Sequence, residues 1–257
     1  MNEVVTKPSA ANIRQADAEF EAKYKIPEEA LRELFGQYPR NIESAQVLLK
    51  VTALNTLYST QIPLYSARIP TIIDVAQYIV NLGIDSALNR GDDELVRKIA
   101  RTESPHKAVR FYYSFATKYC CWHNPKAYPI FDSRVVEYLW HLRNLDYLHQ
   151  FPQKDLWVYP KFKKIVEEFI ASNDLGDFTF KEIDKFLFLQ GAILLGGKEK
   201  GEEKEEEAIL VPVPGQPGEM EWSVENYGSP EEAELSRKRF TEWSDPVIVT
   251  TEGEEKV

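Results

Sequence analysis

The sequence predicts an all-α protein, an orthogonal helical bundle followed by an acidic, disordered tail. Apolar residues recur at helical spacing in several segments before Gly197. No segment alternates apolar and polar residues over six positions, as a half-buried strand would, and hairpin signals rich in glycine are missing. After Gly197 the composition changes to charge runs and spaced prolines. The helical segments are short and joined by short loops, which favours an orthogonal bundle.

The negative charge of the chain is concentrated at one end. The 257 residues carry a formal net charge of −10, with 17 acidic and 7 basic residues in 198–257 and 24 of each in 1–197. An acidic protein is normally a poor partner for nucleic acid, because phosphate contacts need cations. Here that argument applies only to the tail, since the body is neutral.

The predicted organisation has three parts. Residues 1–26 are polar and lack a clear apolar stripe, so we expect a flexible N-terminal arm with some helical tendency over 12–24. Residues 27–197 form the helical domain. Residues 198–257 form the acidic tail, which cannot bury enough apolar surface to offset the entropy of ordering.

Each helix of the domain has its own signals. Pro27 suits the first turn of a helix over 28–35, and Gly83 suits a left-handed cap that ends a helix over 71–82. Asn124 and Pro125 end a long aromatic helix. The predicted helices span 28–35, 42–58, 71–82, 92–101, 105–122, 132–143, 159–172 and 179–195.

Several classes of protein are disfavoured by simple observations. No apolar run is long enough for a signal peptide or a membrane span, so we expect a cytoplasmic protein. Cys120 and Cys121 are adjacent and imply no disulfide framework. With His123 they do not make a zinc site, because adjacent helical residues point about 100° apart and a fourth ligand at motif spacing is missing. No metal and no cofactor are expected.

Residues 111–135, FYYSFATKYCCWHNPKAYPIFDSRV, are the most informative stretch. A helix, an Asn-Pro break and a short extended segment lead to Asp132, which begins the next helix. The helix dipole favours an ionised carboxylate at that position. Asp132 can therefore be a catalytic carboxylate, or it can simply cap the helix.

Two segments resemble the helix-hairpin-helix/GPD superfamily of DNA glycosylases. PKAYPIFDSRV places Asp132 where the catalytic aspartate of that superfamily heads a helix. LYSTQIPLYSARI, residues 57–69, resembles the helix end whose glutamine enters the DNA stack, and Gln61 is the matching residue. Within the superfamily, bacterial proteins similar to 8-oxoguanine glycosylase, including an antiviral type acting on modified phage DNA, are the nearest branch.

The resemblance implies an enzyme that flips a modified base out of double-stranded DNA and hydrolyses its N-glycosidic bond, leaving an abasic site. Asp132 would stabilise the oxocarbenium ion or orient water. Two features depart from the pattern. The iron–sulfur cysteines are absent, and no glycine lies between Gly91 and Gly176, where the superfamily has a G-x-G hairpin. Either Thr102-Glu-Ser-Pro replaces the hairpin or the chain is a degenerate relative.

Lys118 precedes Asp132 by 14 residues. Bifunctional members of the superfamily use a lysine as Schiff-base nucleophile, but in a different register. Lys118 can thus be a nucleophile, a phosphate or base contact, or a partly buried lysine paired with a carboxylate. A monofunctional enzyme that uses water is the prediction.

The remaining candidates would contact DNA or the flipped base. Tyr58 flanks Gln61. Asn55 and Ser59, one turn apart, could line the cleft or satisfy local backbone groups. The aromatic positions of 111–122 include rings that could sandwich a base or form a core stripe. Nine basic against five acidic residues between 90 and 134 could follow a phosphate backbone or decorate an ordinary surface. The predicted DNA- and base-binding residues are Gln61, Tyr58, Asn55, Tyr113, Tyr119, Trp122 and Arg134.

Two other functions remain open. One is a non-catalytic DNA- or protein-binding module with a glycosylase-like fold. The other is an interaction factor whose working part is the acidic tail. The tail could also cover the basic surface of the domain and compete with DNA.

Overall fold

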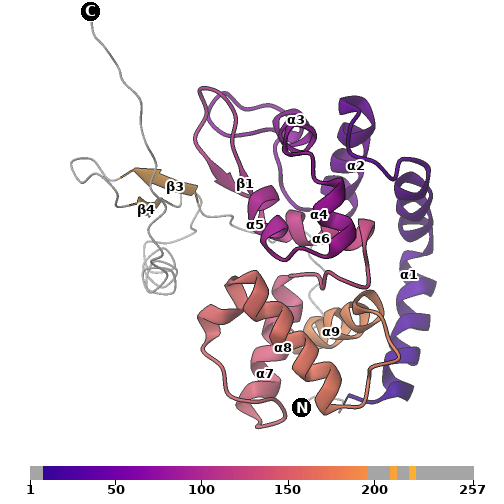
Figure 1. The fold of residues 1–257 in the computed structure, drawn as a ribbon. Coiled ribbons are helices and arrows are strands. Elements are labelled where there is room, and N and C mark those ends of the chain that lie inside the picture. Colours follow the sequence, from indigo (N-terminus) through magenta and orange to yellow (C-terminus); the bar gives the residue numbers. More distant parts are fainter. Residues whose placement is uncertain (1–7, 196–208, 213–219, 224–257) are drawn as a thin grey trace, which may run out of the picture.

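The computed structural model describes residues 8–195, 209–212 and 220–223, and this part of the chain is mostly helical (Figure 1). The helices are α1 (Ala10–Gln37), α2 (Ser44–Leu57), α3 (Ile72–Leu82), α4 (Asp85–Arg90), α5 (Glu94–Ala100), α6 (Tyr113–His123), α7 (Ser133–Asn144), the short 3-10 helix η1 (Gln153–Trp157), α8 (Tyr159–Ser172) and α9 (Phe180–Leu194). The strands are β1 (Arg101–Thr102), β2 (Arg110–Phe111), β3 (Ile209–Pro212) and β4 (Met220–Ser223). The prediction of an all-α class is confirmed at this level.

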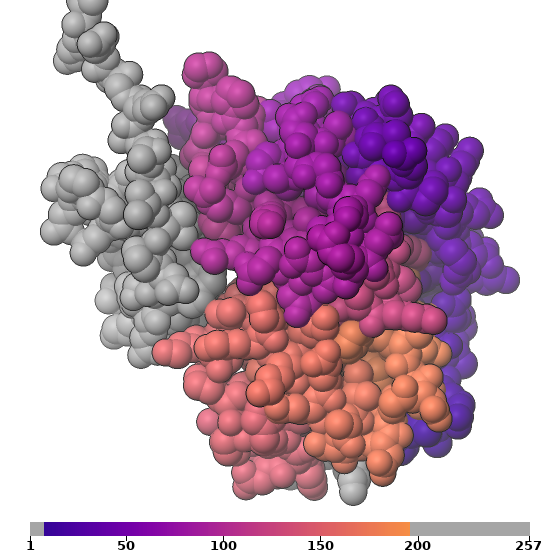
Figure 2. All heavy atoms as spheres, in the orientation of Figure 1, coloured from indigo at the N-terminus to yellow at the C-terminus, as the bar shows by residue number. Residues whose placement is uncertain are grey.

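The helices form two lobes that share one hydrophobic core. Figure 1 shows α2 to α6 in the first lobe and α7 to α9 in the second, with α1 running along the side of both. In the space-filling view the atoms of α8 and α9 lie directly against those of the first lobe (Figure 2). An ion pair of 2.7 Å between Lys163 of α8 and Asp93 at the start of α5 joins the lobes. Helix α6 is central, and its residues 115–121 are all buried.

Helix α1 corrects the predicted N-terminal arm. It begins at Ala10, where Ser9 accepts a hydrogen bond from the backbone of Asn12, and it is kinked at Tyr24. Ile13 and Phe20 are buried, and Phe20 packs edge-on against Phe188 of α9. The arm is therefore part of the folded body from residue 10 onward. Only Ile13, Ala16 and Phe20 are buried in this part of α1, which is too few for a recognisable apolar stripe in the sequence.

A small hairpin corrects the predicted helix over 105–122. Helix α6 begins only at Tyr113, since Arg110 and Phe111 pair with Thr102 and Arg101 in an antiparallel ladder of two residues each. In the tail, Ile209–Pro212 pairs with Met220–Ser223, where no regular structure was expected. The rest of the predicted tail lies outside the described residues. Within the described part, no helix is long and apolar enough to cross a membrane.

Local chemistry sets the helix boundaries that the sequence did predict. Thr71 and Asp74 form a capping box at the start of α3, and Gly83 ends it with a left-handed φ of 61°. Thr179 and Glu182 form a second capping box at the start of α9. Such boxes satisfy backbone N–H groups that have no partner inside the helix.

The junction between α1 and α2 is organised by a buried lysine. Lys50 of α2 is fully buried, and its ammonium donates to the carbonyls of Tyr38 and Arg40 at 3.0 Å and to Oδ1 of Asn41 at 2.7 Å. Nε2 of His123 lies 3.3 Å from the same ammonium. Burial lowers the pKa of Lys50 to about 8, although the charge of Asp85 opposes the shift.

This lysine predicts a stability change at alkaline pH. Its pKa in the folded protein lies below that in the unfolded chain, so the unfolded chain binds more protons between pH 8 and 10 and stability rises across that range. Relative to Lys50→Met, we expect the free energy of unfolding of the wild type to rise by about 2 kcal/mol from pH 8 to pH 10. Urea unfolding of both proteins at several pH values measures the difference. Parallel pH profiles would contradict it.

Candidate functional site

Asp132 stands at the N-terminus of α7, as the sequence predicts. It has an extended backbone, and its Oδ1 accepts a hydrogen bond of 3.1 Å from the backbone N–H of Arg134. Its Oδ2 lies 3.1 Å from Nζ of Lys118. The residue is only 7% exposed. The carboxylate is therefore a helix cap and also one half of a buried ion pair.

Lys118 lies inside the protein, with 1% of its surface exposed. Its Nζ also donates to Oγ of Ser114, one turn earlier on α6, at 2.6 Å. The ring of Tyr58 lies beneath the ammonium, with 5.6 Å between Nζ and the ring centroid. Of the readings that the sequence left open, the structure bears out a lysine paired with a carboxylate. A buried pair of this kind is costly to break, because the remaining charge has no partner.

A second polar group adjoins this pair. Tyr58 donates to Oε1 of Glu28 on α1 at 3.0 Å, and Nζ of Lys181 on α9 lies 2.6 Å from Oε2 of the same carboxylate. The Lys181 ammonium also lies 3.1 Å from the centroid of the Trp122 ring. Burial lowers the pKa of Lys181 and raises that of Tyr58 well above its usual value.

Asp184 of α9 is an unusual carboxyl group. Its Oδ1 is buried and has no hydrogen-bond partner among the described residues. Burial raises the pKa of Asp184 to about 8, and the charge of Asp132 adds to the shift while Lys118 and Lys181 oppose it. The group is therefore largely protonated at neutral pH. Buried polar groups without partners are rare in native proteins and often mark functional sites.

Close packing of α7 on α9 fixes the position of Asp184. At Gly191 a Cβ atom would overlap the carbonyl of Arg134, so the two backbones touch there. The Arg134 guanidinium lies 4.6 Å from the ring centroid of Phe188, one turn earlier on α9. Asp184 lies one further turn back. We call the residues Glu28, Tyr58, Lys118, Asp132, Lys181 and Asp184 the buried ionic cluster.

The loop after α2 displays Gln61. Asn55 holds this loop: its Oδ1 accepts from Thr60 Oγ1 and the Ile62 backbone at 2.9 and 2.8 Å, and its Nδ2 donates to the Ile62 carbonyl. Gln61 is exposed and has a left-handed φ of 56°. The amide of Asn55 is thus occupied in positioning the loop, the second of the two roles that the sequence left open for it.

The predicted base-binding rings have different surroundings. Tyr119 is fully buried and donates to Oδ1 of Asn41, so it is a core residue in this structure. Tyr113 packs against Phe131 and Tyr159, and its hydroxyl is buried. Arg134 is 8% exposed and lies against Phe188. Trp122 alone among these four residues lines the pocket described below.

The hairpin of β1 and β2 lies in the part of the chain where the resemblance would require a G-x-G hairpin. Its loop is tied to α3, because Asp74 accepts from Ser104 Oγ and Lys107 Nζ, both at 2.6 Å. Burial opposes ionisation, but hydrogen bonds from Lys107, Ser104 and Thr71 prevail and hold the pKa of Asp74 well below its usual value. The loop is therefore shaped by side-chain bonds in place of glycines.

Fewer than half of the nine basic residues between 90 and 134 are exposed. Arg110, Lys118 and Arg134 are buried, and Lys107 is paired with Asp74. The exposed ones are Arg90, Arg97, Lys98 and Lys126. Part of the excess that suggested phosphate contacts is thus used inside the fold.

The two cysteines are free and buried. Burial raises the pKa of Cys120 well above its usual value and that of Cys121 to about 12. Within the described residues, no group of three or more histidine, cysteine or acidic side chains is placed to hold a metal ion.

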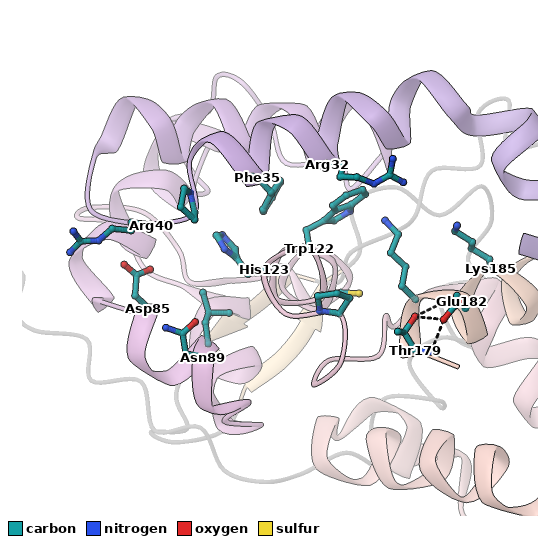
Figure 3. Close-up of a pocket in the computed structure, with 16 residues that line it drawn as sticks. Arg32, Phe35, Arg40, Asp85, Asn89, Trp122, His123, Thr179, Glu182 and Lys185 are labelled. Carbon is teal, nitrogen blue, oxygen red and sulfur yellow. Dashed lines mark hydrogen bonds between the residues drawn. The ribbon is translucent and has the colours of Figure 1, made fainter. Parts of the chain in front are cut away.

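A pocket of about 750 Å³ lies beside the buried ionic cluster (Figure 3). It opens between the end of α1, α4, the end of α6 and the start of α9. Cys121, Trp122 and Lys181 line it, whereas Lys118 and Asp132 do not. Lys181 therefore belongs both to the pocket lining and to the buried ionic cluster.

Comparisons with known proteins identify the family. A family model described as the N-terminal domain HI_0787_N matches residues 9–127. An uncharacterized protein of Haemophilus influenzae is 37% identical over 164 residues, which cover 62% of this chain and 78% of that protein. No solved structure matches the chain. The chain belongs to the family of the Haemophilus influenzae protein.

Three members of the cluster were not predicted. Glu28, Lys181 and Asp184 lie on helices where charged residues normally face solvent, and Lys181, Asp184 and Lys185 follow one another at helical spacing. A sequence signal was nevertheless present. Asp184 is followed by KFLFLQGAILL, an almost wholly apolar stretch, and a helix so apolar is buried on most sides.

Proposed function

We propose that this protein is a DNA glycosylase with a fold of the helix-hairpin-helix/GPD type. It would bind double-stranded DNA in the cytoplasm, flip out a base and hydrolyse its N-glycosidic bond, leaving an abasic site. The observation that carries the proposal is the carboxylate of Asp132, fixed at a helix N-terminus with Nζ of Lys118 3.1 Å away. The helix, short hairpin and helix formed by α5, β1, β2 and α6, followed by Asp132, support the same assignment.

Hydrolysis of the N-glycosidic bond is favoured by a fixed negative charge near the deoxyribose. Breaking the bond between C1′ and the base develops positive charge on the deoxyribose, and a carboxylate held in place stabilises it without reorganising. The same group can orient the attacking water and accept its proton. Asp184, protonated at neutral pH, adds a proton source within the cluster for the departing base.

Lys118 supports a monofunctional enzyme. Attack on C1′ by the amine would require its lone pair, but Nζ is engaged with both Asp132 and Ser114. Holding and orienting Asp132 is the simpler role. Water is then the nucleophile, and the strand is left uncut.

In this proposal the side chain of Gln61 enters the DNA stack. Its exposed position on a loop held by Asn55 suits a side chain that fills the gap left by a flipped base. Tyr58 connects that loop to the cluster through its contact with Lys118. Substrate entry requires rearrangement, because Asp132 and Lys118 are both buried. Modified bases, such as those of phage DNA, are the substrates to test for an antiviral role.

A non-catalytic DNA-binding module is the second candidate. The closed ion pair and the missing G-x-G hairpin favour it. This module would bind DNA in a manner sensitive to salt. It would form no abasic sites, and its binding would not depend on Asp132.

Incubation of the full chain with duplexes carrying normal, oxidised, methylated or glucosylated bases separates the two candidates. A glycosylase leaves alkali-labile abasic sites in one or more of these duplexes, and a monofunctional one leaves no strand break before alkali. DNA binding without abasic sites in any duplex would reject the enzyme and support the module.

A further inference from the structure

The pocket beside the buried ionic cluster has its own chemistry (Figure 3). With about 750 Å³ it is within the range of small-molecule sites, roughly 300 to 1,000 Å³. Its lining comes from four separate helices and the loops that join them. Since Lys118 and Asp132 do not line it, any ligand it holds is bound by other residues.

Among the side chains that line this pocket, basic residues outnumber acidic ones. Four basic side chains line it, Arg32, Arg40, Lys181 and Lys185, against two acidic ones, Asp85 and Glu182. Both acids are already occupied. Asp85 accepts from the backbone and side-chain amides of Asn41 at 3.0 and 2.7 Å, and Glu182 accepts from Thr179 at 2.7 Å.

The basic side chains differ in how far they are committed. Lys181 is paired with Glu28, and Lys185 is paired with Asp17 and Glu21, each at 2.6 Å. Arg32 lies 3.8 Å from Glu21 and is largely exposed. The guanidinium of Arg40 has no hydrogen bond or ion pair with any described residue. Arg32 and Arg40 are therefore the cations most available to a ligand, and their planar groups suit phosphate oxygens.

The inner wall offers groups that recognise a heterocycle. Burial, and then the charge of Lys50, lower the pKa of His123 to about 3, so its ring is neutral at physiological pH. Because the Lys50 ammonium lies 3.3 Å from Nε2, that nitrogen accepts and Nδ1 carries the hydrogen. Asn89 adds an exposed amide from α4, with both a donor and an acceptor.

The aromatic part of the wall is rigid. Phe35 packs against Trp122 and His123, with ring centroids 5.8 and 4.9 Å apart. An apolar floor with a few polar groups around it is the usual composition of a site for a planar ring.

We infer that this pocket is a binding site for a nucleoside phosphate, with the phosphate at Arg40 and the base at His123 and Asn89, which lie at the same end of the pocket (Figure 3). The inference does not depend on glycosylase activity, because no residue of the proposed catalytic pair contacts the pocket. A free nucleotide and a nucleotide within a single strand share this chemistry.

Calorimetric titration of the full chain tests the site with three sets of probes: the four deoxynucleoside monophosphates, the matching nucleosides and short single-stranded oligonucleotides. We expect the monophosphates to bind at least about tenfold more tightly than the nucleosides, because a nucleoside lacks the phosphate and cannot make the charge-assisted contact with arginine. Arg40→Ala should weaken monophosphate binding about tenfold. Arg97→Ala is the matched control, because Arg97 is an exposed arginine of α5 outside the pocket.

Two further variants make the outcome sharp. Asn89→Ala, at an exposed position of α4, should reduce discrimination between bases. Asp132→Asn should leave nucleotide affinity unchanged. Absence of binding by every probe, equal affinity for nucleosides and monophosphates, or equal effects of Arg40→Ala and Arg97→Ala would overturn the inference. If oligonucleotides bind and free nucleotides do not, the site recognises a nucleotide within a single DNA strand. If the protein binds nucleotides but forms no abasic sites, the proposed glycosylase activity is rejected and the inferred nucleotide site is supported.

Discussion

Replacing Asp132 with asparagine should lower the rate of abasic-site formation about 10³-fold, the loss typical of removing one preorganised electrostatic group. Asparagine keeps the size of the side chain and can still accept the N-cap hydrogen bond from Arg134. It removes the negative charge opposite the developing oxocarbenium ion, and it also leaves Lys118 without its ion-pair partner, so the variant should be less stable than the wild type. In protein that remains folded, the effect on activity should fall on the chemical step and leave DNA affinity within a few-fold of the wild type.

Ser133→Ala is the matched control for this experiment. Ser133 is exposed and begins α7 beside Asp132, so the substitution perturbs the same turn without touching the carboxylate. Single-turnover rates for both variants, with thermal melts to verify folding, provide the measurement. Equal loss in both would mean that the turn itself matters, and full activity in Asp132→Asn would remove Asp132 from the mechanism.

The sequence predicted helices well where a local signal ended them. The predicted ranges 71–82, 159–172 and 179–195 agree within a residue with α3, α8 and α9. Capping boxes start two of these helices, and Gly83 ends one of them. Such signals act between neighbouring residues, so they can be recognised without knowledge of the fold.

The packing of residues 10–26 within α1 and the β1–β2 hairpin were missed because distant residues determine them. Residues 10–26 become a packed helix through α9, where Lys185 pairs with Asp17 and Glu21. Residues 105–112 depart from the predicted helix because Asp74 holds Ser104 and Lys107, and because Arg110 and Phe111 pair with β1. Lys185 and Asp74 are both distant in sequence from the residues they contact, so no periodic pattern in the sequence indicates these contacts.

The site was predicted in part for the same reason. Asp132 and Lys118 belong to one continuous segment, and Tyr58 and Trp122 were placed on helices that do meet near them. Glu28, Lys181 and Asp184 come from the two ends of the domain, and only tertiary packing brings them to Lys118. A charged residue on a helix looks the same in a sequence whether it faces water or another charge.

Gly191→Ala should destabilise the protein by about 3 kcal/mol, because overpacking against rigid backbone costs at least as much as a strained core substitution. A Cβ atom at this position would overlap the carbonyl of Arg134, which cannot move without shifting α7. For a domain of this size the melting temperature should fall by roughly 10 °C. Since Asp132 caps α7, the shift should also lower any activity that depends on its carboxylate.

Gly36→Ala provides the opposite expectation within the same protein. Gly36 is exposed in α1, and a Cβ atom there would meet nothing within 4 Å. Alanine is a better helix former than glycine, so this variant should gain about 0.5 to 1 kcal/mol. Urea unfolding of both variants checks the pair. Equal stability of Gly191→Ala and the wild type would mean that α7 and α9 are not in backbone contact, and the position assigned to Asp184 beside Asp132 would lose its support.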